Sequence, residues 1–458
     1  MSGQTFFRRN APHRPAAGVS EFDPLVLADA VLEVAHAALE RAGRVDSVAI
    51  ANQRASTVVW DRKTGRPLGP GIGWQDLRTI GQCLTLKAAG LRLAPNQSAT
   101  KLAYLLASSA GDADAEPIFG TLDTWIAWQL TNGALHVTDS SNAAVTGLLR
   151  ADASGWDEEV LAALKIDAGV LPALVASSGL LGEAGALPGA PLLAGLVGDQ
   201  QASLIGQGCT TPGAVKATFG SGGMLDLCVG TARPGFAVHG ERGTFPIVAW
   251  RDDAGLTWGI EAILLAAGTC VEWLRDGLGL IASVEESDAL AASVRDSGGV
   301  TFVPAFGGLG TPLWDFGARG ALVGLDQSTT RAEIVHAVLD GIAHAGADLL
   351  EAVEGDAAVQ IAELRVDGGM SANGTFLQLL ADATGRPVLP SEITEATTLG
   401  AAFLAGTATG RYPSVAATAA LARHRAVVEP RRRADRDRRR DARARALKTV
   451  PFLSTLEF

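Results

Sequence analysis

The chain has 458 residues, of which 47% are hydrophobic and 19% charged, so it can build a sizeable core. That composition excludes a wholly disordered or fibrous protein. Lys and Arg number 38 against 49 Asp and Glu, and the formal net charge of −11 argues against a general nucleic-acid or membrane-surface binder. The length predicts two or three domains.

The cysteines and the N-terminus bear on the compartment. The four cysteines are far apart and form no C-x-x-C pair; they are Cys83, Cys209, Cys228 and Cys270. This favours free thiols in a reducing, cytoplasmic setting over a disulfide framework or a zinc site. The N-terminus has no apolar core of a secretory signal, and no run of about 18 apolar residues lacks polar breaks, so we expect no transmembrane helix.

The first half alternates predicted helices and strands. They are a helix at 26–43, strands at 48–51 and 57–60, a buried helix at 119–130 and a strand at 192–197. The last strand ends in Gly198, Asp199 and Gln200. Sheets of α/β proteins bind their ligands at the carboxyl ends of strands, so this end is a candidate site.

The second half repeats the pattern. Its predicted elements are a meander of strands at 214–219, 224–229, 246–250 and 256–260, helices at 262–279 and 331–353, a strand at 362–366, and helices at 372–384 and 397–409. Strand–glycine–helix units in both halves predict two related α/β domains that face a cleft. We place them at residues 1–205 and 206–458.

The segment 430–446 is rich in arginine with interspersed aspartate. A solvated charged helix explains this pattern better than a nucleic-acid-binding tail does.

Three glycine turns in the second half suggest a nucleotide site. They lie at Gly220–Gly223 around Ser221, at Gly268, and at Gly368–Gly369 before Asn373. Glycine lets backbone N–H groups approach an anion closely, and a helix N-terminus adds a favourable dipole. Each turn alone is weak evidence, but together they make a phosphate site the better interpretation.

Asp199 is the main catalytic candidate. A carboxylate at a strand end can accept the proton of a hydroxyl that attacks a phosphoryl group, and can help to hold Mg²⁺ through water. The alternative is an aspartate that makes a turn or caps the next helix.

Arg54 and Trp74 suit a small polyhydroxyl ligand. An arginine donates to oxygens, and an indole offers an apolar wall to C–H faces. The alternatives are a surface ion pair for Arg54 and ordinary packing for Trp74.

Together these segments resemble the FGGY carbohydrate kinases, and among them the glycerol kinases. The matching stretches occur in the family's order across about residues 20–425: 52–54 with 57–65, 74–76, 119–125, 136–143, 198–207, 216–223, 266–276, 302–315, 366–373 and 397–406. The resemblance implies two actin-like (ribonuclease-H-like) domains that close on ATP, with Mg²⁺, and on a polyol or sugar.

The resemblance also implies roles for single residues. Asp199 matches the catalytic base, and the polyol-contacting positions are Arg54, Trp74, Asp199 and Gln200. The nucleotide-contacting positions are Ser221, Gly268, Glu272, Gly369 and Asn373. Glu272 stands where the family often has glutamine, which weakens that assignment, and the resemblance assigns no metal-ligating role to a residue of this chain.

Three positions depart from the glycerol kinase pattern. Ala55 stands where glutamate is usual, Ser140 where tyrosine is usual, and Met224 where phenylalanine is usual. Loss of hydrogen-bonding partners changes substrate discrimination strongly. We therefore expect a substrate larger than glycerol, or differently hydroxylated.

The front of the chain also departs from the family. The family opens with a strand that ends in Asp-x-Gly-Thr, and residues 1–50 contain no such motif. Residues 2–7 match the family's third strand better, so the first domain is expected to lack its N-terminal strands. Phosphoryl transfer depends on positioned charge, so we expect severely reduced activity in the chain as written. A start site assigned too far downstream and a decayed kinase both explain this.

The leading functional prediction is ATP-dependent phosphorylation of a small polyol, in the manner of glycerol kinase. The alternatives are another FGGY kinase acting on a tetritol, pentitol or ketose, and an impaired protein that binds ligand without turnover. Expected partners are small molecules, with no nucleic acid and no membrane. The resemblance implies a homo-oligomer.

Overall fold

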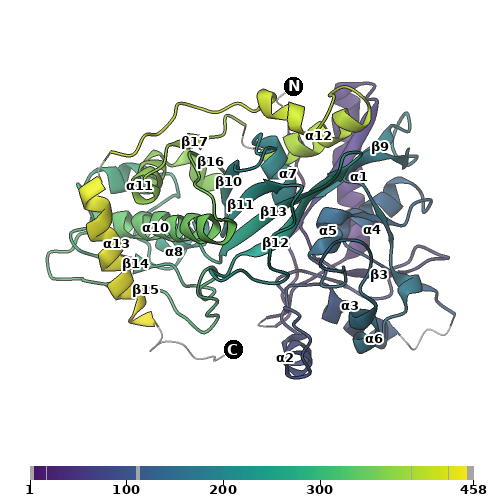
Figure 1. Ribbon diagram of the computed structural model, residues 1–458, viewed down its shortest axis with the longest axis horizontal. Helices are drawn as coiled ribbons and strands as arrows, with labels where there is room; N and C mark the ends of the chain where they lie inside the picture. The colour runs from purple at the N-terminus through teal and green to yellow at the C-terminus, as the bar shows by residue number, and fades with distance from the viewer. Residues whose placement is uncertain (1–4, 17, 110–113, 394, 432, 451–458) are drawn as a thin grey trace. The chain divides into compact units, whose positions relative to one another are not determined.

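The computed structural model describes residues 5–16, 18–109, 114–393, 395–431 and 433–450. The chain forms two compact units, which can be followed by colour in Figure 1. The first unit comprises Met1–Ile205, Ile247–Thr257 and Thr397–Thr418; the second comprises Gly206–Pro246, Trp258–Ala396 and Ala419–Phe458. The chain therefore alternates between the units through six segments.

The first unit combines short strands with helices. Its strands are β1 (Glu21–Phe22), β2 (Ser47–Asn52), β3 (Val58–Asp61), β4 (Gly71–Ile72), β5 (Pro117–Gly120), β6 (Val137–Asp139), β7 (Ala173–Val175), β8 (Ser178–Glu183) and β9 (Leu192–Gly198). They form a three-stranded sheet in the order β2-β9-β8 and three pairs, β1-β4, β3-β5 and β6-β7.

The helices of this unit begin with α1, and its helical segments are α1 (Pro24–Ala42), α2 (Ile80–Ala88), α3 (Ala99–Ser109), α4 (Leu122–Leu130), α5 (Ser140–Ala144), α6 (Glu158–Leu164), η1 (Ala168–Val170), α7 (Asp199–Gly206) and α12 (Ala396–Ala408). The Asp23 side chain caps α1 by accepting from two backbone N–H groups, and Pro24 occupies its first position. Proline lacks only an N–H that would be unpaired there, so the sequence starts the helix at this point.

Two first-half predictions need correction. Residues 119–130 were expected to be one buried helix, but residues up to Gly120 continue β5, and α4 starts at Leu122. The segment is apolar on all sides because both parts are buried, so its composition does not mark the change of structure. The third-strand match at 2–7 also fails over residues 5–7, which form no strand; residues 2–4 lie outside the described residues.

The second unit is built around one larger sheet. Its strands are β10 (Val215–Phe219), β11 (Gly223–Gly230), β13 (Gly255–Leu264), β14 (Thr301–Val303), β15 (Ala321–Val323), β16 (Leu364–Asp367) and β17 (Val388–Pro390), together with the start of β12 (Phe245–Asp252), whose residues from Ile247 on fall within the first unit. Six of them pair in the order β12-β13-β11-β10-β16-β17, and β14 pairs with β15. The expected meander is therefore wrong, because β13 and not β12 pairs with β11.

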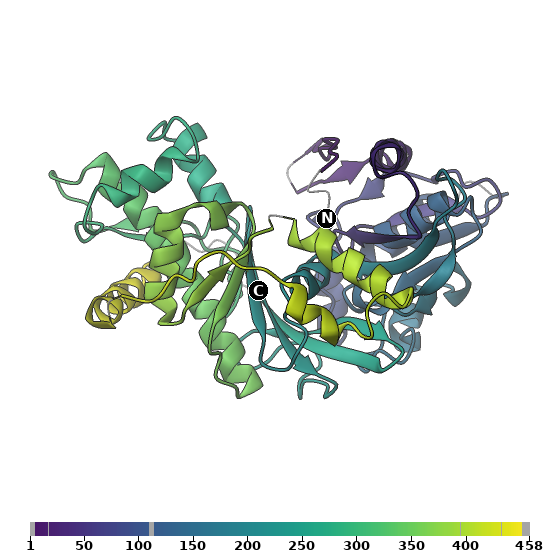
Figure 2. The same ribbon diagram turned by 90° about the horizontal axis from the view of Figure 1, so that it is seen from above.

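The helical segments of this unit are α8 (Gly268–Asp276), α9 (Glu286–Ala292), α10 (Arg331–Ala357), η2 (Gly369–Ala372), α11 (Gly374–Thr384), η3 (Ala416–Leu421) and α13 (Arg433–Leu447). The helix expected at 262–279 is shorter at both ends, because β13 runs on to Leu264 and α8 starts at Gly268. Helices α10 and α11 lie together on one face of the sheet and bury its apolar side chains (Figures 1 and 2).

The arginine-rich segment forms α13, so the helix expected at 430–446 is present, but it is less solvated than expected. Arg439 pairs with Asp340 at 2.8 Å, and Arg443 pairs with Asp348 at 2.7 Å. Arg443 is only 5% exposed. The helix thus docks on α10 through charged side chains instead of standing free in water.

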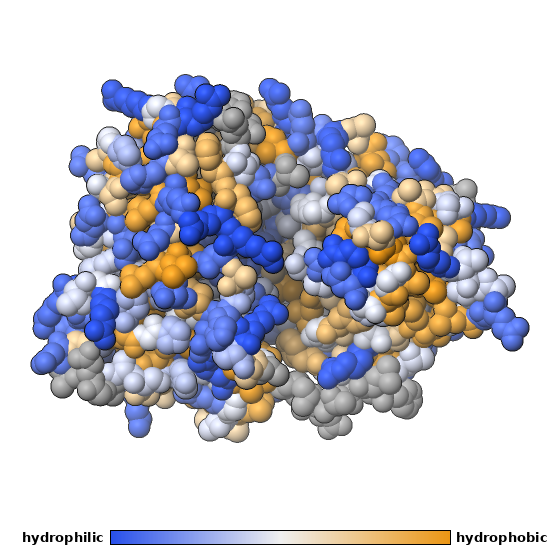
Figure 3. All heavy atoms as spheres, turned by 180° about the vertical axis from the view of Figure 1, so that it is seen from behind, coloured by the Kyte–Doolittle hydropathy of each residue, from blue (hydrophilic) through white to orange (hydrophobic). Residues whose placement is uncertain are grey.

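The four cysteines are buried, free thiols. Among the described residues, no helix is long and apolar enough to cross a membrane. The face shown in Figure 3 mixes hydrophilic side chains with smaller hydrophobic areas, a pattern usual for the surfaces of folded proteins.

Candidate active site

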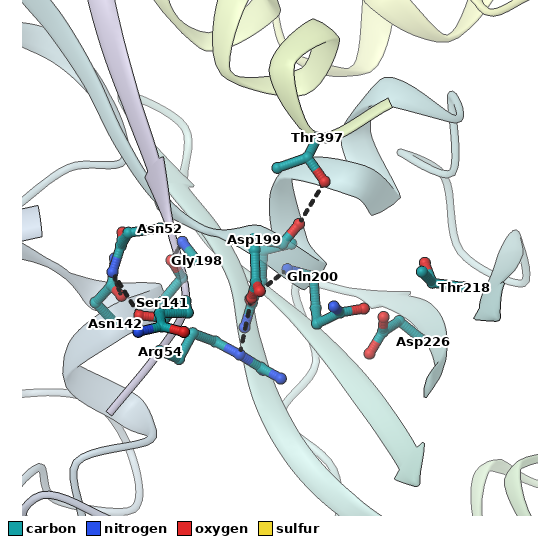
Figure 4. Close-up of polar contacts among 12 residues, drawn as sticks. Asn52, Arg54, Ser141, Asn142, Gly198, Asp199, Gln200, Thr218, Asp226 and Thr397 are labelled. Carbon is teal, nitrogen blue, oxygen red and sulfur yellow. Dashed lines mark hydrogen bonds and ion pairs between the residues drawn. The ribbon is translucent and has the colours of Figure 1, made fainter. Parts of the chain in front are cut away.

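Asp199 begins α7 directly after β9, and Arg54 lies beside it. The Asp199 Oδ1 atom is 3.6 Å from Arg54 Nε and accepts a hydrogen bond from the Gln200 N–H at 2.9 Å (Figure 4). The Arg54 side chain is 10% exposed and that of Asp199 is 35% exposed. A buried guanidinium thus faces a carboxylate that solvent or a ligand can reach.

The pairing of two parallel strands explains why these residues meet. β2 and β9 run parallel, with Asn52 opposite Gly198, so both strands end at the same edge of the sheet. Arg54 follows the first strand and Asp199 the second. A Cβ on Gly198 would lie 2.7 Å from Arg54 Cδ, so only glycine lets the arginine pass to the carboxylate.

Residues that follow β6 form hydrogen bonds with the ends of β2 and β9. Asn52 and Asn142 exchange amide hydrogen bonds at 2.9 and 3.1 Å, and Ser141 Oγ accepts from the Gly198 N–H at 2.9 Å. The buried Asp139 carboxylate accepts from the N–H groups of Ser141 and Asn142, and burial raises its pKa. Our site predictions did not include these supporting roles, although the stretch 136–143 was singled out as a motif.

Trp74 lies in the loop after β4, within the same unit. Its side chain is half-buried, Gln75 is exposed and Asp76 is buried. Asp76 accepts from the Ser20 N–H at 2.7 Å and pairs with Arg78 at 2.8 Å. These contacts hold the loop in place, with the indole at its tip partly open to solvent.

Two of the positions that depart from the glycerol kinase pattern lie in the first unit, and both are buried. Ala55 is 6% exposed and Ser140 is 1% exposed. Ala55 has φ 60°, a left-handed conformation that a side chain with Cβ adopts at some cost. These two side chains therefore have little solvent-accessible surface, and the expectation of a larger or differently hydroxylated substrate stays a prediction. Met224, on β11 of the second unit, is half-buried.

The first two glycine turns of the second unit meet. The Gly268 N–H donates to Gly220 O at 2.8 Å, and the Ala267 N–H donates to Ser221 O at 2.8 Å. A Cβ on Gly268 would lie 2.6 Å from Gly220 O, so this close approach requires glycine. The Ser221 side chain is exposed at the turn.

The third turn joins the same place. Gly368 has φ 85°, and a Cβ on it would lie 2.5 Å from Phe219 O. A Cβ on Gly369, by contrast, would meet nothing within 4 Å. The three predicted turns therefore converge on residues 219–221, with open space in front of Gly369.

Asn373 and Glu272 fit the nucleotide prediction less directly. The Asn373 side chain caps α11 by accepting from the Phe376 N–H at 2.8 Å, and its amide donates to Ser287 Oγ at 3.0 Å. Glu272 is exposed on α8. Asn373 thus shapes the turn that contains Gly369, and Glu272 remains accessible on α8, the helix that Gly268 begins. The residues described hold no cluster of three or more His, Cys, Asp or Glu that could bind a metal.

Comparison with known proteins identifies the family. Residues 5–206 match the model of the FGGY family of carbohydrate kinases, N-terminal domain, and residues 217–409 match that of the C-terminal domain. The chain belongs to the FGGY family of carbohydrate kinases. Its fold is the two-domain, actin-like (ribonuclease-H-like) fold of that family, which confirms the fold predicted from the resemblance.

Several relatives are glycerol kinases. The glycerol kinase of Trichlorobacter lovleyi is 44% identical over 418 residues, which cover 87% of this chain and 84% of the relative. That of Aromatoleum aromaticum is 43% identical and covers 90% and 86%. Among solved structures, Plasmodium falciparum glycerol kinase with ADP matches with a TM-score of 0.87 at 26% identity, covering 98% of this chain and 93% of that one.

Other FGGY kinases share the fold. The xylulose kinase of Rhodospirillum rubrum matches with a TM-score of 0.83 at 22% identity, covering 97% of this chain and 94% of that one. Membership of this kinase family makes the chain a phosphotransferase and implies the use of ATP.

Proposed function

We propose that this FGGY kinase transfers the γ-phosphoryl group of ATP to a hydroxyl of glycerol or a closely related polyol. The observation that carries the proposal is the Asp199 carboxylate, which stands at a strand end beside the buried Arg54 at 3.6 Å. The 44% identity to a glycerol kinase supports this substrate class.

Asp199 acts as the general base in this proposal. Its carboxylate accepts the proton of the attacking hydroxyl as the new P–O bond forms. The Arg54 guanidinium and the Gln200 N–H orient one carboxylate oxygen, and together with Trp74 and the Gln200 side chain they bind the polyol. An arginine near the carboxylate also donates hydrogen bonds to substrate oxygens.

The nucleotide binds to the converging turns of the second unit in this proposal. Backbone N–H groups near Ser221 and Gly369 bind the phosphates, as glycine turns commonly do. Gly268, whose own N–H donates to Gly220 O, lies against the nucleotide without donating to it. Asn373 and Glu272 contact the nucleotide farther from the phosphates. When bound, Mg²⁺ would neutralise phosphate charge, and the partly exposed Asp199 suits a contact to it through water.

Replacement of Asp199 tests the base directly. Asp199→Asn keeps the size and removes the proton acceptor, so we expect kcat to fall by about 10²–10⁴. ADP affinity measured by calorimetry should stay unchanged. Asp253→Asn, an exposed aspartate of the same unit, is the control. Both variants are assayed in the 458-residue chain and in a version to which the family's Asp-x-Gly-Thr segment has been added at the N-terminus. If Asp199→Asn turns over substrate as fast as the unsubstituted protein in both versions, the role is refuted.

A substrate panel tests the specificity. Glycerol, erythritol, xylitol and D-xylulose are compared by kcat/KM with ATP. The identity to glycerol kinases favours glycerol as the best substrate. A clear preference for a tetritol, pentitol or ketose would instead support the hypothesis of a larger or differently hydroxylated substrate.

The remaining proposals concern partners. The resemblance to the family supports a homo-oligomer, which light scattering of the purified chain would measure. The net charge of −11 supports a protein that binds neither nucleic acid nor membranes.

A further inference from the structure

Lys101 is a buried lysine that the proposed chemistry does not use. It lies on α3 and is completely buried. Its Nζ donates to three backbone carbonyls: Gly73 O at 2.9 Å, Trp74 O at 3.1 Å and Asn96 O at 3.4 Å. An ammonium group has three hydrogens, so one side chain can serve all three acceptors.

Two of these carbonyls lie on either side of the Trp74 Cα. The Gly73 carbonyl belongs to the peptide before Trp74, and the Trp74 carbonyl to the peptide after it. A single group that holds both oxygens restricts φ and ψ of Trp74, and so the direction in which its side chain leaves the backbone. The other side of the loop is held by the Gly73 N–H, which donates to Ser20 O at 2.9 Å.

A buried lysine is an energetically unfavourable side chain at this position. Among the residues described, no carboxylate lies within ion-pair distance of Lys101, and the nearby Asp76 pairs with Arg78 instead. A buried charge without a counter-charge is unfavourable, and an apolar side chain of the same size would avoid that cost. The carbonyl bonds are thus what the ammonium contributes here.

We propose that Lys101 is a positioning residue of the polyol site, which holds the backbone of Trp74 so that the indole faces the substrate. This inference rests on the proposed function, because it takes Trp74 to contact the polyol. It adds a residue outside the substrate contacts that governs substrate affinity and leaves the nucleotide turns untouched.

A pair of lysine variants tests the inference by calorimetry. Lys101→Met keeps the length and removes every donor, so glycerol affinity should fall about tenfold, the equivalent of about one hydrogen bond to a charged group. ADP affinity should stay within about twofold, since tenfold is the effect expected of a lost contact. Lys87→Met removes an exposed lysine of the same unit and should change neither affinity.

The wild-type pH profile gives a second readout that needs no variant. Burial lowers the pKa of Lys101 to about 7. A neutral amine has two hydrogens for three carbonyls, so glycerol affinity should fall as pH rises from about 6 to about 8.5. The charged neighbours are Asp76, Arg78 and Cys83; the pKa of Asp76 is lowered and those of Arg78 and Cys83 are raised, so none of them titrates in this range.

The outcomes separate the two proposals. Glycerol binding by the wild type that weakens with pH, together with weak, pH-independent binding by Lys101→Met, supports the positioning role. If the wild type binds glycerol with a flat profile, or Lys101→Met binds it equally well, the positioning role is overturned and the proposed function stands. If the wild type binds no polyol at all, both are overturned. Should Lys101→Met fail to fold, the wild-type profile decides.

Discussion

Two glycines of the turns that we propose to bind the nucleotide differ in their surroundings. At Gly268 a Cβ would collide with Gly220 O at 2.6 Å, so the requirement comes from the protein itself. At Gly369 a Cβ would meet nothing within 4 Å, so any requirement there comes from a bound ligand. Alanine substitutions at the two positions therefore separate folding from binding.

We expect Gly268→Ala to lower the free energy of unfolding by about 1–3 kcal/mol, because the backbone must shift to admit the methyl group. Gly369→Ala should leave stability within about 0.5 kcal/mol but weaken ADP binding about tenfold. Thermal melts and calorimetry with ADP measure both effects.

Gly235→Ala, at another open position of the second unit, is the control for both variants. Normal ADP affinity in Gly369→Ala would argue against nucleotide contact at that turn.

The buried Asp123 and the half-buried His136 of the first unit respond to acid in opposite ways. Burial, reinforced by the Asp139 carboxylate, raises the pKa of Asp123 to about 6 from 3.8. Burial lowers the pKa of His136 to about 4 from 6.5, despite its contact with Phe119 O at 2.7 Å. As pH falls from about 6 to 4, the folded state takes up a proton at Asp123 and gains stability, while His136 resists protonation and costs stability.

Variants of these two residues should separate their opposite effects on the pH dependence of stability. Asp123→Asn removes the gain, so stability should fall more steeply between pH 6.5 and about 4 than in the wild type. His136→Gln removes the cost, so stability should fall less or rise over the same range. Urea unfolding at several pH values gives the comparison, with Asp253→Asn as the control. Wild-type slopes in both variants would mean that neither group is coupled to folding.

The site residues could be predicted from the sequence only where the signal is local. Asp199 and Arg54 each follow a readable strand, and parallel pairing brings them together. The reciprocal bonds of Asn52 and Asn142 join residues 90 positions apart, so no spacing rule indicates them. Likewise, nothing local shows that the carbonyls on either side of Trp74, in a loop, accept hydrogen bonds from a lysine on α3.

At the scale of elements, α13 combines charged contacts to α10 with apolar packing of Ala446 and Leu447. Arg443 is buried and pairs with Asp348, whose side chain is 32% exposed. Hydrogen bonds to charged groups contribute about 1.5–3 kcal/mol, and the partial exposure of Asp348 places this pair at the lower end. Loss of Arg443 should therefore release α13 from α10 without unfolding the unit.

Arg443→Met tests this by hydrogen exchange. Amides of α13 should exchange faster, while those of α10 should stay protected. Arg445→Met changes an exposed arginine of the same helix and should have no effect. Unchanged protection of α13 in Arg443→Met would show that apolar contacts hold the helix.

Elements with a clear period were predictable, and elements within continuous apolar runs were not. The helix α1 and the strands β2 and β9 lie within two residues of their predictions. The predictions at 119–130 and 262–279 each merged a strand end with a helix, because buried strands and buried helices are equally apolar. The order of β12 and β13 depends on pairing between strands, which sequence distance alone does not determine.

At the scale of the whole molecule, the first unit is assembled from three separate stretches of chain. Ser178 Oγ donates to Leu404 O at 2.8 Å, and the Ser177 N–H donates to Arg251 O at 2.8 Å. Residues 1–205 alone therefore lack partners that their own sheet uses. The domain boundary near 205 stays a prediction, and this arrangement bears on how to test it.

We expect residues 1–205, expressed alone, to show no cooperative thermal transition, because α12 no longer covers the sheet. A version that carries 397–418 through a flexible linker should regain at least part of the transition. Circular dichroism of both forms gives the result. A sharp transition in 1–205 alone would show that this segment folds by itself.

Because the chain alternates between its two units, cleaving the backbone once would produce fragments that depend on each other to fold. A cut in the largely exposed stretch 231–239 would leave each fragment with sequence belonging to both units. The two pieces would complete one another's folds and could be expressed as a complementing pair, so that reassembly itself reports on folding.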